Sequence, residues 1–496
     1  MGNGEKSPAS SQKADSGYNP SFPLAAENFS TTSATGIEGL DFILHGGLPL
    51  ERPTLIRGGP GTGKTVIALT ILCHGLENGE PGVLVTFDES PQTLIQHADA
   101  LGLGLGKHFE QKRVMILDMR PARSDLVSGE NLELTAVLTR ISHALKQIGG
   151  QRLVIDAIDG MDDAFSEARI SVRTELARVF DWLRECAITS VITVGERADF
   201  SHRYGVEDYV ADCVVELKQE MRNRSMSRLL RVIKRRGGGY ETNEFPFLMD
   251  REGVFVLPVT GTKLRSFVST QQVSTGVPEL DNMLGGNGPY QGATVMYSGQ
   301  SGTGKTSFAA HFAAASFKRG ENVLYVSFEE GDEELVRNQG SIGLDLTAGL
   351  GSRSGQGKLL LEPILAVELG WEEHLLRIMR LVQQHQPSVV VLDPISVFDY
   401  KLKEVSSKAL MLRLLHMLKN RGVTTVLTEL LSDDSSGVSS LDISSMIDVW
   451  VKLHRQERES RLYRLLTVVK ARGLPTSDQV SQFIFSENGV QVQGVQ

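Results

Sequence analysis

Two glycine-rich segments of the chain each end in a lysine followed by a threonine, a pattern whose chemistry is phosphate binding. Both match G-x-x-x-x-G-K-[ST] at every specified position. The residues are Gly58, Gly59, Pro60, Gly61, Thr62, Gly63, Lys64 and Thr65 in the first loop, and Gly299, Gln300, Ser301, Gly302, Thr303, Gly304, Lys305 and Thr306 in the second loop. Glycines let backbone N–H groups close around phosphates, and a helix that starts at the loop adds its positive end. The sequence therefore predicts two phosphate sites for nucleotides.

The last residues of each loop have separate roles in such a site. Lys64 and Lys305 would reach the β- and γ-phosphates, and the hydroxyls of Thr65 and Thr306 could coordinate Mg²⁺. An apolar, strand-like run precedes each loop and an apolar helical stretch follows it, which is the context that the pattern needs. A glycine-rich turn could match once by chance, but two matches in the same context favour function.

An acidic pair follows a strand-like run in each half of the chain: Asp88 and Glu89 in the first half, Glu329 and Glu330 in the second. Ligands of open α/β sheets lie beyond the carboxyl ends of the strands, so these acids should face the phosphates. There they could orient or deprotonate a water or a hydroxyl. A solvated acidic turn is the alternative. The two pairs are separated by the same 241 positions as the two loop lysines, which favours catalysis.

A second type of acid, Asp156 and Asp393, closes a strongly apolar run in each half. A charged group there is costly without a partner, and the water shell of a bound Mg²⁺ would supply one. A helix N-cap beside Pro394 is the alternative for Asp393. The candidate metal ligands are therefore these two aspartates, Glu330 and the two loop threonines.

A basic cluster before a glycine closes each half: Lys234 and Arg236 in the first, Lys470 and Arg472 in the second. Both clusters follow apolar, strand-like runs. Side chains at i and i+2 on a strand share one face, which suits contact with a phosphate group. An exposed hairpin edge protected by lysine is the alternative.

The elements that must position these residues are repeated too. The segment from Thr35 to Asp41 returns as Thr275 to Asp281, and short β-branched runs alternate with amphipathic helical stretches in both halves. This alternation is typical of α/β units around a mainly parallel, buried sheet, and the long period indicates a duplicated domain. We expect a flexible tail over 1–30, a first domain over 31–258, a linker over 259–272 and a second domain over 273–496.

The composition is that of an ordinary globular protein of 496 residues, with 41% hydrophobic and 22% charged residues. The net charge of −9 argues against a mainly electrostatic nucleic-acid binder. No run is long and apolar enough for a membrane span or a signal peptide, so we expect a cytoplasmic protein. The cysteines, Cys73, Cys186 and Cys213, form no metal-binding pattern, and we interpret them as core residues.

From about Thr35 onward the chain resembles the KaiC family of circadian clock proteins, tandem ATPases and autokinases of the RecA-like superfamily. The resemblance rests on both loops, the acidic turns after phenylalanine, the segment from Arg203 to Asp212 and the two basic clusters. It implies two tandem RecA-like P-loop domains, ATP and Mg²⁺ as cofactors, and a double-ring homo-hexamer with ATP between subunits. Lys234, Arg236, Lys470 and Arg472 would then act on the adjacent subunit's nucleotide.

The resemblance also implies a site of phosphorylation. Ser444 and Ser445 match the family's phosphoacceptor motif, in which hydroxyl residues receive phosphate from ATP across the subunit interface. The first half has no such pair, so it would be a hydrolysing ring and the second half a serine autokinase. Without the family, a structural serine-rich loop is the favoured interpretation. Phosphate there would add roughly two negative charges and could act as a switch in timing, signalling or stress response.

Three departures from the family pattern qualify these expectations. Ser445 stands where clock members usually have threonine, and Asp88 stands where they usually have glutamate, so Glu89 is the better candidate for the hydrolytic base. We expect the long C-terminal segment that engages KaiA to be missing after Gln496, and therefore do not expect KaiA as a partner. The expected partner is a KaiB-like protein, which would engage the Arg203 to Asp212 region, or a signalling kinase.

Two further functions fit a RecA-like fold. One is a DNA-dependent ATPase or motor, but the acidic balance and the lack of a basic or zinc-binding module count against it. The other is a nucleotide-gated scaffold that transfers nothing, which the complete set of residues in the second half disfavours.

Overall fold

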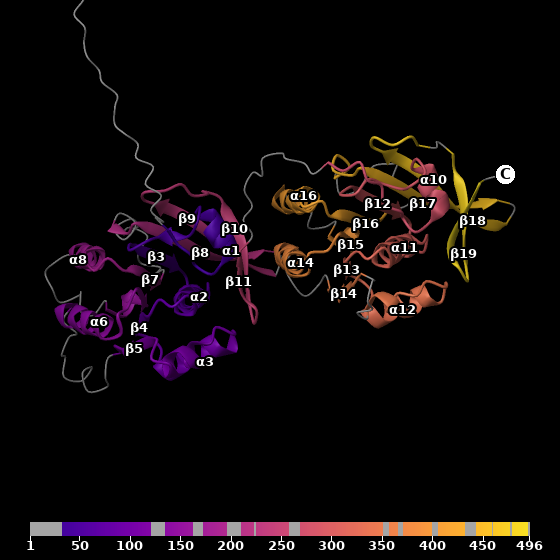
Figure 1. The fold of residues 1–496 in the computed structure, drawn as a ribbon. Coiled ribbons are helices and arrows are strands. Elements are labelled where there is room, and N and C mark those ends of the chain that lie inside the picture. The colour runs from indigo at the N-terminus through magenta and orange to yellow at the C-terminus, as the bar shows by residue number, and fades with distance from the viewer. Residues whose placement is uncertain are drawn as a thin grey trace, which may run out of the picture. The chain divides into compact units, whose positions relative to one another are not determined.

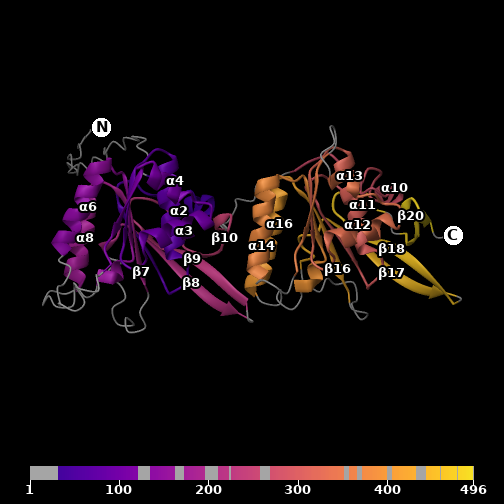
Figure 2. The same cartoon turned by 90° about the horizontal axis from the view of Figure 1, so that it is seen from below.

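The computed structural model describes residues 32–120, 134–161, 172–195, 210–222, 225–256, 268–350, 357–365, 371–398, 405–431, 443–458, 460–476 and 479–494. The predicted tail over 1–30 and most of the predicted linker lie outside these residues. The described part contains two nine-stranded sheets, each with a helical layer on both faces (Figures 1 and 2). Two tandem RecA-like domains are thus observed, as the sequence predicts.

The elements of the first domain follow the expected alternation. Its strands are β1 Thr32–Ser33, β2 Leu48–Pro49, β3 Pro53–Gly58, β4 Gly82–Thr86, β5 Val114–Asp118, β6 Arg152–Asp156, β7 Thr189–Gly195, β8 Cys213–Arg222, β9 Ser225–Arg235, β10 Glu244–Asp250 and β11 Gly253–Val256. Its helices are α1 Glu38–Ile43, α2 Lys64–Glu77, α3 Pro91–Ala100, α4 Leu105–Glu110, α6 Leu134–Ile148, the 3₁₀ turn η1 Ile158–Met161 and α8 Val172–Glu185.

The second domain repeats this order. Its strands are β12 Thr294–Gly299, β13 Val323–Ser327, β14 Leu359–Pro363, β15 Val389–Asp393, β16 Thr424–Leu430, β17 Val449–Arg458, β18 Arg461–Ala471, β19 Ser481–Ser486 and β20 Gly489–Gly494. Its helices are α10 Pro278–Met283, α11 Lys305–Lys318, α12 Asp332–Gly340, α13 Thr347–Leu350, α14 Trp371–His385, the 3₁₀ turn η3 Ile395–Phe398 and α16 Val405–Asn420.

Both sheets have the same topology. The first has the order β11-β10-β9-β8-β3-β7-β6-β4-β5. The second has the order β14-β13-β15-β16-β12-β17-β18-β19-β20, which is the same order written from the opposite edge of the sheet. Six neighbouring strands of each are parallel, from β8 to β5 and from β14 to β17, and the remaining three are antiparallel. The strand that carries each loop, β3 or β12, therefore lies inside the parallel part, where its carboxyl end meets those of its neighbours.

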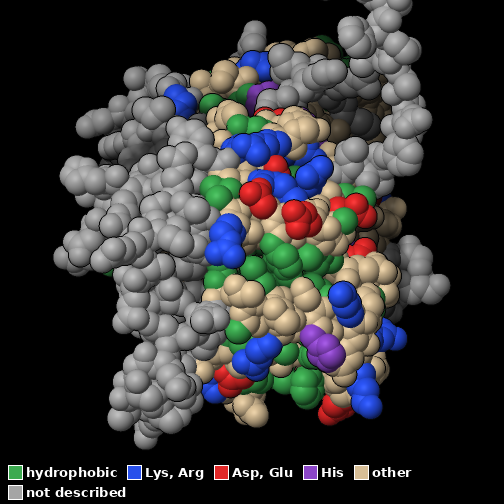
Figure 3. Space-filling model, turned by 90° about the vertical axis from the view of Figure 1, so that its left-hand side faces the viewer, with side chains coloured by type: hydrophobic (Ala, Val, Ile, Leu, Met, Phe, Trp, Pro, Cys, Tyr) green, Lys and Arg blue, Asp and Glu red, His purple; other side chains and the backbone are tan. Residues whose placement is uncertain are grey.

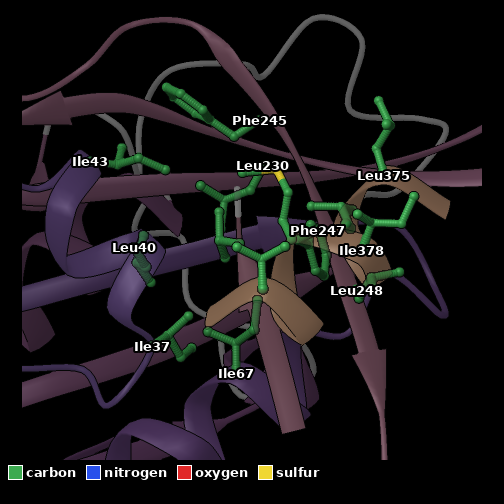
Figure 4. Close-up of a cluster of buried hydrophobic side chains, with 14 of the residues drawn as sticks. Ile37, Leu40, Ile43, Ile67, Leu230, Phe245, Phe247, Leu248, Leu375 and Ile378 are labelled. Carbon is green, nitrogen blue, oxygen red and sulfur yellow. The ribbon is translucent and has the colours of Figure 1, made fainter. Parts of the chain in front are cut away.

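Apolar faces determine these layers. Every residue of β4, β6, β13 and β15 is buried, as expected for central parallel strands covered on both faces. In Figure 2, α6 and α8 cover one face of the first sheet and α2 and α3 the other. Figure 4 shows part of the buried core, to which Leu40, Ile67, Leu230 and Phe247 all contribute.

The cysteine interpretation is confirmed in full for two residues and in part for the third, because Cys186 packs against a core cluster of the first domain without being buried in it. Cys73 and Cys213 are buried, whereas Cys186 is half-buried just after α8. A helix end leaves a side chain partly open to water, a position that periodicity alone does not reveal. No helix of the described residues is both long and apolar enough to cross a membrane.

Candidate nucleotide sites

The first loop connects β3 to α2 and is closed by its own lysine. The Lys64 ammonium donates to the carbonyl oxygens of Gly58 at 2.8 Å and Gly59 at 2.9 Å. Gly61 and Gly63 have φ of 73° and 98°, a region that favours glycine. A Cβ at Gly63 would also lie 2.9 Å from Met249 Sδ of β10. The loop is therefore preformed, with the lysine at its centre and the helix N-terminus beside it.

The second loop connects β12 to α11 in the same way. Lys305 donates to the carbonyl oxygen of Gln300 at 2.9 Å, and Gly302 and Gly304 have φ of 69° and 101°. Burial lowers the pKa of Lys305, while the nearby Asp393 and Glu329 counteract this shift. A bound phosphate would supply the negative charge that the half-buried ammonium needs.

Both strand-end aspartates face the threonine of the adjacent loop. Thr65 Oγ1 donates to Asp156 at 3.1 Å, and Thr306 Oγ1 donates to Asp393 at 3.4 Å. The aspartates are only 4% and 5% exposed. Burial raises the pKa of Asp156, and the negative charges of the nearby Asp88 and Glu89 add to the effect. The pairing of aspartate with loop threonine thus occurs in both domains.

Further hydroxyls hold these aspartates, and sequence reasoning missed them. Thr193 of β7 donates to Asp156 Oδ1 at 2.5 Å, Thr428 of β16 donates to Asp393 Oδ1, and Tyr325 of β13 donates to Asp393 Oδ2 at 2.6 Å. No local signal singles out Thr193 and Thr428, because β7 and β16 contain other serine, threonine or glutamate residues as well. The N-cap alternative for Asp393 is not what the structure shows, since its partners are side chains of the sheet and the loop.

One carboxylate and one threonine hydroxyl per site fit Mg²⁺ that arrives with a nucleotide. This ion usually takes one or two carboxylates together with phosphate oxygens and waters. Within the described residues, no group of three or more His, Cys, Asp or Glu side chains could hold a metal by itself. The residues that would hold Mg²⁺ are Thr65 with Asp156, and Thr306 with Asp393.

The acidic pairs form the same turn in both domains. Thr86 Oγ1 bridges the carbonyl and the N–H of Glu89 at 2.8 and 3.2 Å, and Ser327 Oγ bridges those of Glu330 at 2.7 and 3.1 Å. This closed turn fixes the backbone of the acids at the carboxyl ends of β4 and β13. The expected position beyond the strands is therefore observed.

The acids of each pair have different surroundings. Burial and the charge of Asp159 raise the pKa of Asp88, and Lys64 opposes them. The Glu89 carboxylate lies 3.2 Å from the ring of His97. In the second domain, burial raises the pKa of Glu330, the Asn338 amide donates to it at 3.4 Å and lowers the pKa, and the nearby carboxylates raise it further.

The basic clusters contact their own chain. Lys234 donates to the carbonyl of Ala211 at 2.8 Å, and Arg236 lies 3.5 Å from the carboxylate of Asp212. A β-bulge between Val214 and Val215 shifts the register of β8 against β9 just before this cluster. The contact of Lys234 and Arg236 with the nucleotide of a neighbouring subunit stays a prediction.

In the second domain the basic cluster holds the predicted phosphoacceptor segment. Lys470 donates to the carbonyl of Ser444 and Arg472 to the carbonyl of Ser445, both at 2.8 Å. The two serines lie in the turn before β17, where Ser444 is half-buried and Ser445 is exposed. Most of the predicted KaiB-binding segment, residues 203–209, lies outside the described residues.

The indole of Trp450, on the strand next to β12, contacts the residue that precedes the second loop. Trp450 of β17 donates through Nε1 to the hydroxyl of Ser298 at 2.7 Å, directly before the loop's first glycine. The side chain of Trp450 is 4% exposed. Its environment therefore depends on the position of the strand that carries the loop.

Comparison with known proteins gives the same family for both halves of the chain. The model of the KaiC ATPase family matches residues 33–261 and again 273–496. The chain is 38% identical to the circadian clock protein KaiC2 of Synechocystis sp., covering 92% of this chain and 80% of that protein. It is 31% identical to the circadian clock oscillator protein KaiC of Prochlorococcus marinus, covering 92% and 91%. Two matches of the family model and relatives aligned over nearly the full length agree with the duplicated site, and the chain belongs to the KaiC family of ATPases.

Proposed function

We propose that this chain hydrolyses ATP in its first domain and uses ATP in its second domain to phosphorylate Ser444 and Ser445. The observation that carries the proposal is the contact of Lys470 and Arg472 with the backbone of these two serines. The same cations are expected to reach the nucleotide of a neighbouring subunit. A subunit that places Lys470 and Arg472 at its neighbour's nucleotide would therefore place the two serines near the same nucleotide.

The transfer follows from the groups around the second loop. A serine hydroxyl attacks the γ-phosphorus, the bond to the β-phosphate oxygen breaks, and ADP leaves. Glu330 accepts the proton of the hydroxyl, which its raised pKa favours. Lys305 stabilises the charge that develops on the phosphates, and Mg²⁺, when bound, neutralises part of the same charge.

The first domain has the parts for hydrolysis without an acceptor. Asp88 and Glu89 occupy the place of Glu329 and Glu330, and a water would take the place of the serine hydroxyl. In strand register the positions that correspond to the two serines are Asp208 and Tyr209, so the first domain has neither serine nor threonine there. We propose that the two rings of a homo-hexamer divide the chemistry in this way, with the phosphoserines as a switch in timing, signalling or stress response.

A KaiB-like protein and a signalling kinase remain the proposed partners. A DNA-dependent motor is the less favoured function. On the face in Figure 3, the described basic side chains are mixed with acidic and apolar ones and form no continuous basic surface. Phosphate-backbone binding needs such a surface.

The test is to incubate the protein with Mg-ATP labelled at the γ-phosphate and to map the label by peptide mass spectrometry. We expect label on Ser444 and Ser445, none in the Ser444→Ala/Ser445→Ala variant, and a loss of about 10²- to 10⁴-fold in Glu330→Gln. Glu89→Gln is the matched control, because it should lose hydrolysis and keep the label. Hydrolysis without protein-bound label in the unmodified chain would contradict the autokinase.

A further inference from the structure

The two loops differ in the side chain that lies against their tips. In the second domain, Arg455 of β17 donates through Nη2 to the carbonyl of Gly302. A Cβ at Gly302 would lie 2.5 Å from the same nitrogen. In the first domain the nearest side-chain atom to such a Cβ at Gly61 is Oε1 of Gln219, at 3.4 Å.

Strand register shows that these two side chains are equivalent. Gly58 pairs with Leu217 of β8, and Gly299 pairs with Leu453 of β17. Gln219 and Arg455 each come two residues later and point to the same side of their strand. One position therefore holds a neutral amide in the first domain and a guanidinium in the second.

The guanidinium of Arg455 has N–H donors that could bind an anion. Arg455 contacts the carbonyl of Gly302, three residues before Lys305 in the same loop, so two cations belong to this loop. Among the described residues, no acceptor lies within hydrogen-bond reach of the buried Nε of Arg455. Two neighbouring cations and a buried donor are unfavourable until a phosphate group lies between them.

The order of the strands indicates which phosphates Arg455 can reach. β17 borders β12 on one side, whereas β16, β15 and β13 lie on the other. Asp393 ends β15, and the acids Glu329 and Glu330 follow β13, so the groups that act on the γ-phosphate all lie opposite Arg455. Arg455 is thus on the side of the loop away from the acids that would act on the γ-phosphate.

We propose that Arg455 binds the α- and β-phosphates of the nucleotide in the second domain, which therefore holds ADP and ATP more tightly than the first domain does. The inference rests on the proposed function, because it takes the second loop as a nucleotide site. Since ADP keeps both phosphates, product release from the second domain is slower than from the first. Arg455 is a binding residue of this site and has no proton to transfer.

The test measures equilibrium binding of ADP and of ATP to the full chain, with the first site disabled by Lys64→Ala. In this background we expect Arg455→Gln, which introduces the side chain found in the first domain, to weaken both nucleotides by about tenfold. The salt dependence of binding should become shallower, since one phosphate contact with a cation is lost. The reverse change, Gln219→Arg in a Lys305→Ala background, should tighten ADP and ATP at the first site.

The outcomes separate this inference from the proposed function. Unchanged affinity and unchanged salt dependence in Arg455→Gln, while Lys305→Ala abolishes binding, would overturn the role of Arg455 alone. Weaker binding of ATP but not of ADP would also overturn it, because it would place the contact on the γ-phosphate. If Lys64→Ala already removes all binding, the second loop is not a nucleotide site and the proposed function fails as well. Thermal unfolding of each variant shows that the fold is retained.

Discussion

Burial and neighbouring carboxylates raise the pKa of Glu330, while the amide of Asn338 lowers it. A general base acts only when it is deprotonated, so a raised pKa makes activity fall at a higher pH on acidification than for an ordinary glutamate. We expect Asn338→Ala to shift the acid limb of serine phosphorylation to still higher pH, because the bond that favours the charged carboxylate is lost. The measurement is the initial rate of serine labelling against pH.

Hydrolysis by the first domain provides the control for this prediction. It depends on the acids of the first pair, and its pH profile should be the same in Asn338→Ala and in the unmodified chain. An acid limb of labelling that does not move would mean that another group titrates.

Asp156 illustrates the cost of a buried functional carboxylate. Its pKa is raised because burial disfavours the charged form, although hydrogen bonds from Thr193 and Thr65 counteract this. At neutral pH the folded state must keep a charge that the unfolded state solvates better. We expect Asp156→Asn to stabilise the protein by about 1 kcal/mol while weakening Mg-nucleotide binding.

The pH dependence checks the cause of this gain. A carboxyl whose pKa is raised in the folded state destabilises that state at pH values above the raised pKa. This destabilisation declines as the pH falls through the raised pKa, because the group becomes protonated. The stability difference between Asp156→Asn and the unmodified chain, from denaturant unfolding, should therefore be largest near neutral pH and decline in acid. A gain independent of pH would exclude the charge as its cause.

At the scale of elements, the strand–loop–helix unit depends on glycine in the left-handed region. Gly63 has a φ of 98°, and a Cβ there would lie 2.9 Å from Met249 Sδ. We expect Gly63→Ala to lower stability by about 1 to 2 kcal/mol and to abolish nucleotide binding by the first loop. Thermal unfolding and nucleotide titration measure the two effects.

Gly79 is the matched control. Its φ is 84°, and a Cβ there would meet nothing within 4 Å. Gly79→Ala should therefore cost a similar backbone strain and leave nucleotide binding intact. Equal loss of binding in both variants would mean that general instability, and not the shape of the loop, causes the effect.

The sequence predicts the elements of the site better than the contacts between them. The loops, the acidic turns and the strand-end aspartates follow from local patterns, because each lies where a strand passes into a loop. The hydroxyls of Thr193 and Thr428 and the guanidinium of Arg455 come from strands far away in the chain. Their positions depend on sheet order and register, which no local pattern contains. The resemblance supplied the role of the two serines, which spacing alone would leave as a loop.

At the scale of the whole molecule, the duplicated domains should be separable by their lysines. We expect Lys305→Ala to abolish serine label and retain most hydrolysis, because the first site is unchanged. Lys64→Ala should lose most hydrolysis and retain the capacity for label. Phosphate release and peptide mapping from the same reaction check both. Loss of both activities in Lys64→Ala, with its fold retained, would contradict a division of chemistry between domains.

Assembly is a separate expectation. Sites completed by a neighbouring subunit require an oligomer, and native mass spectrometry with Mg-ATP should show six times the chain mass of 54.2 kDa. Labelling of the serines by a monomeric chain would contradict a site that is completed by the basic cluster of a neighbouring subunit.

The bond from Trp450 to Ser298 gives the second domain an intrinsic optical probe. The chain has three tryptophans, and the indole of Trp450 is buried against the strand that leads into the second loop. Indole emission changes with the polarity and hydrogen bonding around the ring. Filling of the second loop should therefore be visible in the fluorescence of the unlabelled protein, and substitution of Trp450 by phenylalanine identifies its share of the signal.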